Sequence, residues 1–403
     1  MHILLLNQYY PPDTAATARM AATLAESLAV RHRVTVLAAR PSYDPTEFHP
    51  YYLLRRELHG NLTIERVGAT AYPRFRMRGR VANYLSYLAL AVPRALALRA
   101  DLILAMTDPP IAGLAGALVA RLNHRPFLYN IRDLYPDMAV SGGILRASWF
   151  THLWEGLHRW ALHQAVRVVV LGEDMRERVV AKGVASERVF IVRDGAPIPE
   201  TLPPPDHPVT RQVRCGFPFV LLHAGNLGFY GAWETLLAAA RKLQAVAPGQ
   251  IGLVFVGDGA VRKRLEADLA EETSPVRWLP FRPAGEVPYV LAAGDLHIVT
   301  VRRGLQGVVV PSKLYPVLAA GRPVLAVAPE ESDVARIVRR AGCGLVADPD
   351  DPDAVARAVL TVYQDRTRLI EMGRRAREAA QEYDRVNQLK RFVELIESLT
   401  ASP

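Results

Sequence analysis

The sequence predicts an α/β protein made of two doubly wound, Rossmann-like parallel-sheet domains in tandem. Its 403 residues are too many for one ordinary hydrophobic core and correspond to about two or three domains of roughly 100–200 residues each. Short apolar runs alternate with amphipathic segments long enough for crossover helices, which is typical of parallel sheets. A proline-dense segment at 194–216 interrupts this alternation, which restarts at Phe217. We therefore expect two similar domains that face each other across a cleft.

The first domain is expected to cover residues 1–197 and to begin with a buried strand. The chain opens with four consecutive apolar residues, Ile3 to Leu6, before the polar pair Asn7 and Gln8. This run is far shorter than the apolar region of a signal peptide or the ~20 residues that span a bilayer. Four later runs have the same character, and the expected strands are His2–Leu6, Arg33–Ala38, Asp101–Ala105, Arg125–Tyr129 and Val166–Leu171.

A proline-rich linker is expected at 198–216, because proline lacks a backbone N–H donor and disfavours both helices and central strands. The second domain is expected at 217–384. A C-terminal helix within 385–403, whose apolar residues recur at helical spacing, either closes the second domain or crosses back to the first. The strands expected in the second domain are Phe219–His223, Gly252–Val256, Val276–Leu279, Leu296–Val301, Pro323–Ala328 and Gly344–Val346.

The composition favours a cytoplasmic protein and admits several kinds of charged partner. The 2 cysteines, Cys215 and Cys343, are too few for a disulfide framework or a cysteine-rich zinc site, so the fold must depend on apolar burial in a reducing compartment. The longest apolar stretch, 84–98, is broken by Pro93 and is too short to span a membrane. A net charge of +9 suits nucleic acid, an anionic membrane surface or a phosphorylated substrate. Nucleic acid ranks last, because the basic residues are scattered over helices without interleaved aromatic residues.

Two loops of the first domain carry candidate site residues, because ligands of open α/β sheets bind beyond the carboxyl ends of the strands. After the first strand, Thr14, Ala15 and Ala16 precede a helix, where small residues and helix amides suit an anionic ligand. The alternative is a plain loop capped by a threonine. After the fourth strand, Arg132 and Asp133 form a charged pair that orients a substrate, with Asp133 accepting a hydroxyl proton. The alternative is an ion pair that holds the loop.

Glycine-rich loops mark candidate ligand contacts in the second domain. Glycine after a strand permits a positive φ and lets a ligand approach the backbone closely, although a plain tight turn has the same pattern. The candidates are Gly225, Asn226 and Gly228 after one strand and Gly257 with Asp258 after the next.

The most informative segment of the second domain is GLQGVVVPSKLY at 304–315. Here the Ser312 hydroxyl and amide, together with the Lys313 ammonium, are expected to hold a diphosphate at the start of a short helix. The segment predicts a phosphate pocket without a Walker sequence.

No metal site and no other cofactor is expected. Asp348 and Asp350 resemble a D-x-D metal motif, as do Asp351 and Asp353. Both pairs directly precede an expected helix at 354–360, where aspartate is a natural N-cap.

In their order along the chain, these segments resemble the bacterial family 4 glycosyltransferases of the GT-B fold, most closely the WbuB-like subgroup of colanic-acid and O-antigen biosynthesis. The resemblance runs nearly end to end, through NQYYPPDTAATARM, HRVTVLAARPSY, NIRDLYPD, VVVLGEDMRERVVAKGV, HAGNLG, FVGDG, LPF with AAGDLHIVTVRRG, and VVVPSKLYPVLAAGRPV. The chain lacks the pair of glutamates that is usual in the family. Pro316 occupies the position of the second glutamate, and Gln306 occupies a nearby position that is acidic in the subgroup. The basic residues that commonly follow the Gly-Asn-x-Gly loop are replaced by Phe229, Tyr230 and Gly231.

The resemblance implies a retaining, hexosyltransferase-type enzyme (EC 2.4) that moves a sugar from a nucleotide-diphosphate donor to a glycan or lipid-linked acceptor in cell-envelope or exopolysaccharide biosynthesis. It implies a donor held mainly by the C-terminal domain, an acceptor held mainly by the N-terminal domain, and catalysis without a bound metal. By their positions, Gly225, Asn226 and Gly228 are implied to lie near the donor diphosphate, and Ser312 and Lys313 to contact its phosphates. Gly257 and Asp258 are implied to lie near the nucleotide. Asp133, beside Arg132, is implied to face the reacting sugar or the acceptor.

Two alternatives share this two-domain plan. A nucleotide-sugar epimerase would consume the donor without an acceptor. A non-catalytic nucleotide-sugar-binding protein, suggested by the missing glutamates, would bind the donor without turnover.

A basic stretch followed by an apolar helix predicts peripheral contact of the first domain with an anionic membrane, at the inner face of the plasma membrane. The stretch 74–80 holds four arginines, and the apolar segment follows at 84–98. The alternative is a core-facing helix preceded by a solvated loop.

Overall fold

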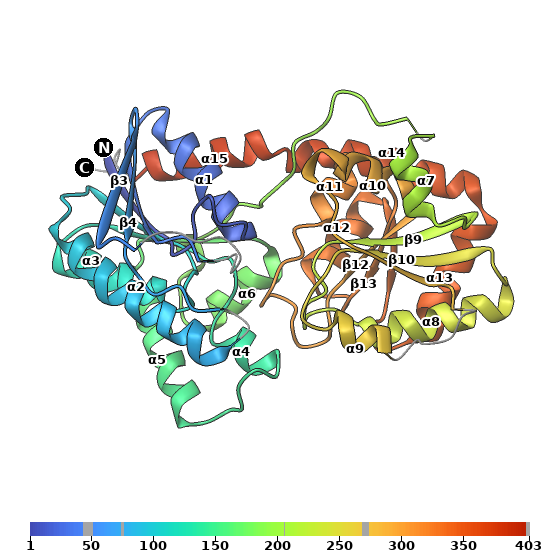
Figure 1. Ribbon diagram of the computed structural model, residues 1–403, viewed down its shortest axis with the longest axis horizontal. Coiled ribbons are helices and arrows are strands. Elements are labelled where there is room, and N and C mark those ends of the chain that lie inside the picture. The colour runs from blue at the N-terminus through green and yellow to red at the C-terminus, as the bar shows by residue number, and fades with distance from the viewer. Residues whose placement is uncertain (43–50, 74–75, 205, 268–273, 400–403) are drawn as a thin grey trace. The chain divides into compact units, whose positions relative to one another are not determined.

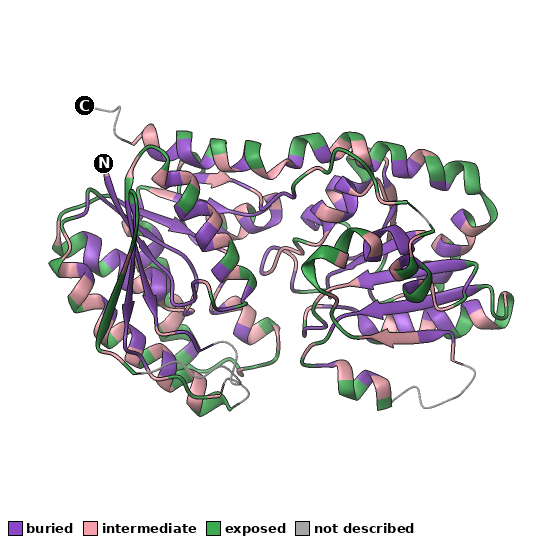
Figure 2. Ribbon diagram, turned by 45° about the horizontal axis from the view of Figure 1, so that its top comes forward, coloured by how far each residue is buried: buried purple, intermediate pink, exposed green. Residues whose placement is uncertain are grey.

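The computed structural model describes residues 1–42, 51–73, 76–204, 206–267 and 274–399. The chain divides into two compact units (Figure 1). The first unit is Met1–Val192 together with Leu389–Pro403, and the second is Arg193–Gln388. In both units the central strands are buried, whereas helices, loops and the edge strand at 54–59 carry exposed residues (Figure 2).

One sheet of eight strands forms the centre of the first unit. The strands are β1 (His2–Leu6), β2 (Arg33–Ala39), β3 (Leu54–His59), β4 (Leu62–Val67), β5 (Leu102–Ala105), β6 (Phe127–Asn130), β7 (Arg167–Val170) and β8 (Val189–Ile191). Their order in the sheet is β3-β4-β2-β1-β5-β6-β7-β8. The edge strand β3 pairs with β4 in antiparallel fashion, and the other neighbours are parallel. The carboxyl ends of β1, β5 and β6 therefore lie next to one another.

Helices cover both faces of this sheet. They are α1 (Ala16–Ala29), α2 (Met77–Ala97), α3 (Ala112–Leu122), α4 (Asp137–Ser141), α5 (Trp149–Gln164), α6 (Glu173–Ala181) and α15 (Arg385–Glu397). One face packs against α1 and the end of α15, whose Phe392 and Ile396 share a core with Ile3 of β1. The opposite face packs against α2, α3 and α5. A Cβ on Gly113 of α3 would lie 2.1 Å from the ring of Tyr129, so this helix needs glycine to approach the sheet.

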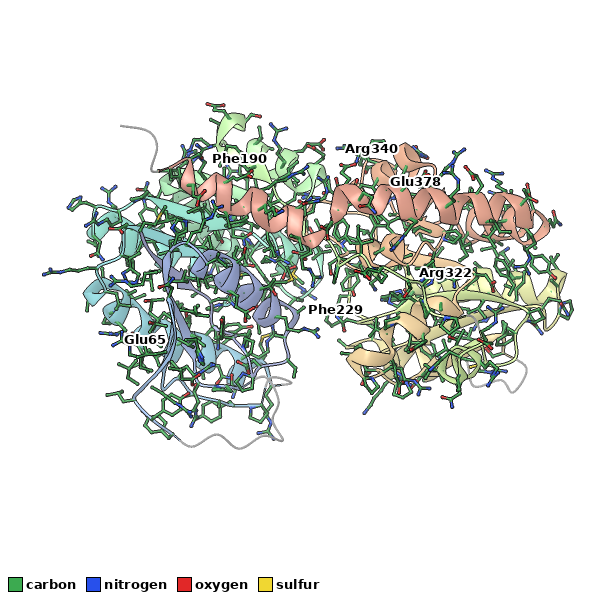
Figure 3. The ribbon with its side chains drawn as sticks, turned by 90° about the horizontal axis from the view of Figure 1, so that it is seen from above. Glu65, Phe190, Phe229, Arg322, Arg340 and Glu378 are labelled. Carbon is green, nitrogen blue, oxygen red and sulfur yellow. The ribbon has the colours of Figure 1, made fainter. Side chains whose placement is uncertain are left out.

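The hairpin of β3 and β4 was not expected from the sequence. Gly60 adopts a φ of +61° in its turn. Glu65 of β4 is only 1% exposed, and Arg94 of α2 binds it at 2.6 Å (Figure 3). Arg66 is also buried and pairs with Glu57 at 3.3 Å. Buried ion pairs interrupt the apolar run by which a buried strand is normally recognised.

The second unit contains a six-stranded sheet that is parallel throughout, in the order β11-β10-β9-β12-β13-β14. Its strands are β9 (Phe219–Ala224), β10 (Ile251–Val256), β11 (Val276–Leu279), β12 (Leu296–Thr300), β13 (Val324–Val327) and β14 (Gly344–Ala347). Its helices are α7 (Pro208–Arg214), α8 (Trp233–Val246), α9 (Arg262–Ala267), α10 (Val287–Ala293), α11 (Leu314–Ala319), α12 (Asp333–Ala341), α13 (Pro352–Gln364) and α14 (Arg366–Ala379). The fold class predicted from the sequence, two doubly wound parallel-sheet domains, is confirmed.

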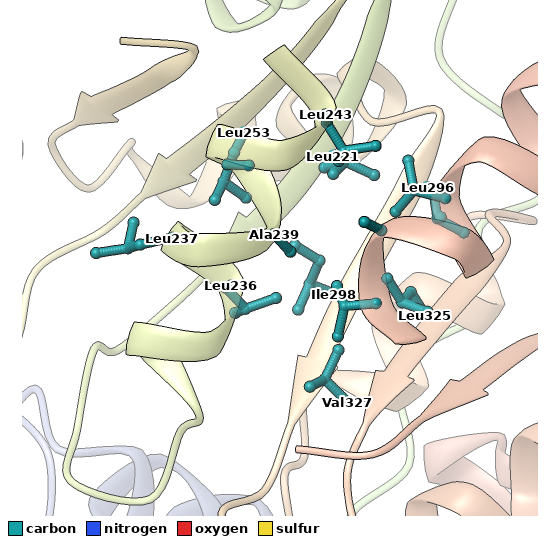
Figure 4. Close-up of a cluster of buried hydrophobic side chains, with 14 of the residues drawn as sticks. Leu221, Leu236, Leu237, Ala239, Leu243, Leu253, Leu296, Ile298, Leu325 and Val327 are labelled. Carbon is teal, nitrogen blue, oxygen red and sulfur yellow. The ribbon is translucent and has the colours of Figure 1, made fainter. Parts of the chain in front are cut away.

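Apolar side chains of α8 and of the strands form the main core of the second unit (Figure 4). Leu236 and Ala239 of α8 meet Leu221, Ile298 and Leu325 of three neighbouring strands. Burial of each large side chain contributes about 1.5–3 kcal/mol. This core fixes the strand ends from which the loops described below emerge.

Part of the expected linker is a helix. Within 198–216, residues Pro208–Arg214 form α7. Pro208 lies in the first turn of this helix, where a backbone N–H has no partner within the helix, so proline is tolerated there. Thr210 donates to the carbonyl of Tyr289 on α10 at 3.0 Å, and Val213 is fully buried. The prediction of a linker over this whole range is therefore wrong at α7, which packs into the second unit.

The longest helix of the first unit, α2, has 21 residues. Among the helices that the structure describes, none combines the length and the apolar character needed to cross a membrane.

Candidate active site

The loops after β9 and β10 touch each other through their backbones. Gly225 donates to the carbonyl of Val256 at 2.9 Å, and Leu227 donates to that of Asp258 at 2.9 Å. Gly257 has a φ of +150°, and a Cβ there would lie 2.0 Å from the Gly225 oxygen. The close approach of the two loops therefore requires glycine at position 257.

Lys313 reaches this pair of loops from the segment before α11. Its Nζ lies 2.7 Å from Nε2 of His223, the penultimate residue of β9. It lies 5.6 Å from the ring centroid of Tyr230 and 3.5 Å from the position that a Cβ on Gly225 would take. These three neighbours carry no negative charge, so the ammonium is suited to bind an anion at the Gly225 loop.

Burial shifts both members of the Lys313–His223 pair toward their neutral forms. Burial, aided by the nearby ammonium, lowers the pKa of His223 well below its usual range. A neutral ring accepts a hydrogen bond from Lys313 through Nε2. Burial also lowers the pKa of Lys313 to about 7, because the charged amine is cut off from water. Lys313 as a whole is half-buried, but its ammonium end lies against the fully buried His223.

The other candidates of the second unit lie at the rim of this group. Asn226 is exposed, and its carbonyl accepts from the Tyr230 hydroxyl at 2.6 Å. Asp258 is exposed and accepts from the Gly259 amide at 2.7 Å. Ser312 is exposed immediately before Lys313. The structure thus brings together Gly225, Asn226, Gly228, Gly257, Asp258 and Lys313, with Ser312 beside them.

Aromatic residues that the sequence analysis did not select hold this loop in place. Trp233 donates from Nε1 to the Gly228 carbonyl at 2.6 Å, and the His223 ring packs edge-on against Trp233 with centroids 4.8 Å apart. His223 lies directly before the glycine loop, and a histidine inside an otherwise apolar strand is the signal that could have identified it.

The two aspartate pairs that resembled a metal motif have other partners. Arg303 binds Asp350 at 2.6 Å and Asp348 at 2.8 Å. Asp351 is the N-cap of α13 and accepts from the Ala354 amide at 2.9 Å, as predicted. Over the described part of the chain, no group of three or more His, Cys, Asp or Glu side chains could hold a metal ion.

The candidates of the first unit lie at the carboxyl ends of β1, β5 and β6. The loops are joined by hydrogen bonds from the Gln8 amide to the Asp108 carbonyl at 2.7 Å and from the Arg132 amide to Thr107 Oγ1 at 3.2 Å. Arg132 and Asp133 are half-buried there. Burial, with added repulsion from Asp133 and then Asp108, raises the pKa of Tyr135. Asp133 thus lies near a phenol and a second carboxylate.

Ala15 is the N-cap of α1, 4% exposed, and no side chain caps this helix. Thr14 and Ala16 are exposed on either side of it. The alternative of a threonine cap is therefore wrong, and the first amides of α1 lack a side-chain acceptor.

Three buried amide side chains at the same edge escaped the sequence analysis. Asn7 Oδ1, both polar atoms of Gln8, and Asn130 Oδ1 are buried without a hydrogen-bond partner among the described residues. An unpaired buried polar group costs about 1–3 kcal/mol. Their signal in the sequence was a polar amide residue at or just after the end of a buried strand.

Comparisons with known proteins fit this two-part arrangement. Residues 15–195 match the model of the glycosyl transferase 4-like domain, and residues 218–365 match that of the glycosyl transferases group 1. The chain is 27% identical over 290 residues to the probable glycosyltransferase WbjE of Pseudomonas aeruginosa, covering 71% of this chain and 72% of the relative. It is 23% identical over 376 residues to the putative colanic acid biosynthesis glycosyl transferase WcaI of Escherichia coli, covering 89% and 91%.

Solved structures of similar fold cover nearly the whole chain. The sucrose-phosphate synthase of Thermosynechococcus elongatus superposes with a TM-score of 0.74 at 18% identity and covers 100% of both chains. Anabaena HepE in complex with UDP and glucose has a TM-score of 0.71 at 20% identity and covers 99% of this chain and 100% of its own. At these identities the likeness shows the fold alone. Because the two family models together match most of the sequence, the chain belongs to the bacterial family 4 glycosyltransferases, enzymes of class EC 2.4 with the GT-B fold.

Proposed function

We propose that this enzyme moves a sugar from a nucleotide-diphosphate donor to a glycan or lipid-linked acceptor, with retention of configuration, in cell-envelope polysaccharide biosynthesis. The observation that carries the proposal is the Lys313 ammonium, placed over the Gly225 loop among uncharged neighbours. The names of two similar proteins support it: WcaI is a putative colanic acid glycosyl transferase, and HepE has been solved with UDP-glucose.

The second unit holds the donor in this proposal. The Gly225 and Gly257 loops let the diphosphate approach the backbone, and Lys313 neutralises part of its charge. Cleavage of the bond between the sugar C1 and the phosphate oxygen adds negative charge to the leaving group. Lys313 stabilises that charge as it develops, which lowers the barrier.

The first unit holds the acceptor. Asp133 with Arg132 positions its reacting hydroxyl. A new bond forms between C1 and the acceptor oxygen on the face from which the phosphate leaves. The hydroxyl proton passes to the departing phosphate oxygen, so the protein mainly orients the reactants.

The proposal requires no metal, because Lys313 supplies positive charge and the nearby aspartate pair is bound to Arg303. Thermal unfolding with a panel of nucleotide sugars, in buffer containing EDTA, tests donor binding. We expect one nucleotide class to raise the unfolding temperature. Stabilisation by none of them would refute the donor assignment, and donor consumption without an acceptor would favour the epimerase.

Replacement of Gly225 with alanine is expected to weaken donor binding about tenfold. Its φ of +139° disfavours any Cβ, which would also lie 3.5 Å from Lys313 Nζ. Gly249→Ala is a matched control, since its φ is +70° and no atom lies within 4 Å of its Cβ position. Titration calorimetry should show reduced affinity in the first variant alone. Equal affinities in both variants would remove the loop from the donor site.

Donor binding near pH 8 is expected to take up a proton. The pKa of Lys313 is about 7 in the unliganded protein, so the amine is mostly neutral at pH 8. A bound diphosphate favours the ammonium and raises this pKa, so affinity falls as the pH rises above 7. Calorimetry in two buffers of different ionisation enthalpy measures the uptake. A binding enthalpy that is the same in both buffers would contradict this proton uptake.

A further inference from the structure

The outward side of α2 is apolar. A surface helix normally buries its apolar stripe and exposes a polar one. On α2, Met77, Val81 and Leu85 are exposed by 52%, 45% and 57%. Ala89 and Pro93 continue this stripe at the same spacing of four residues. The outward stripe from Met77 to Pro93 therefore carries no charged side chain.

The first half of α5 repeats this arrangement with larger side chains. Trp149, Phe150, Leu153 and Leu157 are exposed by 77%, 51%, 53% and 41%. Trp149, Leu153 and Leu157 are also spaced by four residues and so share one side of the helix. Both α2 and α5 belong to the helix layer on one face of the first sheet (Figure 1).

Aromatic contacts join the starts of these two helices into one surface. Tyr135, in the loop before α4, stacks on Trp154 of α5 with centroids 5.8 Å apart, and Trp154 contacts Phe150 at 6.2 Å. On the other side, Tyr84 and Arg80 of α2 lie close enough to the Tyr135 hydroxyl to influence its pKa, which burial mainly raises. We call the outward residues of α2 and of α5 up to Leu157 the α2–α5 face.

The exposed charge around this face is mainly positive. Arg76 and Arg78 are exposed at the start of α2, whereas Arg94 near its end is paired with Glu65 of β4. Residues 138–154, which lead into α5, contain Arg146 and no acidic residue, and Glu155, which follows, is bound to Arg159 and Lys182. Arg78 and Arg146 are exposed at the starts of the two helices. A second copy of the chain would bring arginine against arginine, whereas an anionic lipid surface complements the face.

We propose that the α2–α5 face binds an anionic lipid bilayer, with Trp149, Phe150 and Leu153 inserted among the headgroups and arginines on the lipid phosphates. Apolar insertion combined with basic charge is what interfacial binding requires. The inference deepens the proposed function, because it rests on an acceptor presented at a membrane.

The proposed face differs from the expectation based on sequence. Within the segment 84–98, Tyr87, Ala91 and Ala95 are buried against the sheet, so only the outward stripe is available to lipid. Of the basic stretch 74–80, residues 74–75 lie outside the described residues. The largest exposed side chains instead lie on α5, which the sequence analysis did not consider.

Sedimentation with phospholipid vesicles tests the proposal without donor or acceptor, so its outcome is independent of the transfer reaction. We expect the protein to bind phosphatidylglycerol-containing vesicles, with weaker binding in high salt and to pure phosphatidylcholine. The Trp149→Ser/Phe150→Ser variant should lose about tenfold or more of this affinity. Val30→Ser is the matched control: Val30 is also 77% exposed, but it follows α1 on the opposite face of the sheet.

Unchanged vesicle binding by the double variant would overturn the proposal, as would equal binding of the wild type to anionic and neutral vesicles. A wild-type dimer that the double variant converts to a monomer would assign the face to self-association instead. Transfer to a soluble acceptor should be unchanged in the double variant, which separates membrane binding from the reaction. Circular dichroism confirms that both variants fold, which is expected because the replaced side chains are exposed.

Discussion

Replacing Lys313 with alanine is expected to weaken binding of the nucleotide-diphosphate donor by about 30- to 150-fold, because one charge-assisted contact contributes about 2–3 kcal/mol. Lys313 Nζ lies over the Gly225 loop, with its nearest neighbours uncharged. No basic residue follows that loop, whose next residues are Phe229 and Tyr230. Removal of the ammonium therefore takes away the principal cation that we assign to the diphosphate. Titration calorimetry of the variant with the donor nucleotide measures the loss.

The stability of the Lys313→Ala variant distinguishes a binding role from a structural one. Burial disfavours the charged amine, so its removal should leave the unfolding temperature of the unliganded protein unchanged or higher. Lys242→Ala is the control, since Lys242 forms a surface ion pair with Asp353 at 2.8 Å in the same unit. An unchanged donor affinity in Lys313→Ala, or an equal loss in Lys242→Ala, would refute the role of Lys313.

The second large effect is expected from Asp133→Asn, which should lower kcat by about 100-fold, the scale on which misplacing a reacting group slows a reaction. Asparagine keeps the shape of aspartate but removes its charge. Because the donor is assigned to the other unit, its dissociation constant should stay within about twofold of the wild-type value. Initial rates at saturating donor, together with calorimetry, separate the two quantities.

Asp101→Asn serves as the control for this variant. Asp101 accepts a hydrogen bond from the His2 amide at 2.7 Å, before β5 and thus at the opposite end of the strands from Asp133. The Asp101→Asn variant should retain wild-type turnover. If Asp133→Asn retains full turnover, or loses donor affinity instead, Asp133 does not act on the acceptor.

The strands and their order of appearance could be predicted wherever a short apolar run stands alone. Runs such as His2–Leu6 and Val276–Leu279 coincide with β1 and β11. The prediction failed where charges are buried in pairs, as at Glu65 with Arg94 in β4. It failed again at α7, because prolines around a helix can mark its first turn as well as a linker.

The candidate site was predictable where the backbone itself requires a residue type. Glycines 225 and 257 follow strands and meet in space, and this could be read from their positions. The contact between Lys313 and His223 joins residues 90 positions apart, and only the adjacency of β9 and β12 brings them together. Burial of Gln8 and Asn130 likewise depends on the order β1-β5-β6, which no local pattern specifies.

The central claim, transfer of a sugar from a nucleotide donor, is tested most directly by a transfer assay with isotopically labelled donor. The donor that stabilises the protein is incubated with lipid-linked acceptors in the presence of EDTA, and NMR determines the anomeric configuration of the product. We expect the wild type to form a labelled glycan with the configuration of the donor, and Lys313→Ala and Asp133→Asn to form far less. Donor binding without transfer to any cell-envelope acceptor would contradict this account, as would a product of inverted configuration.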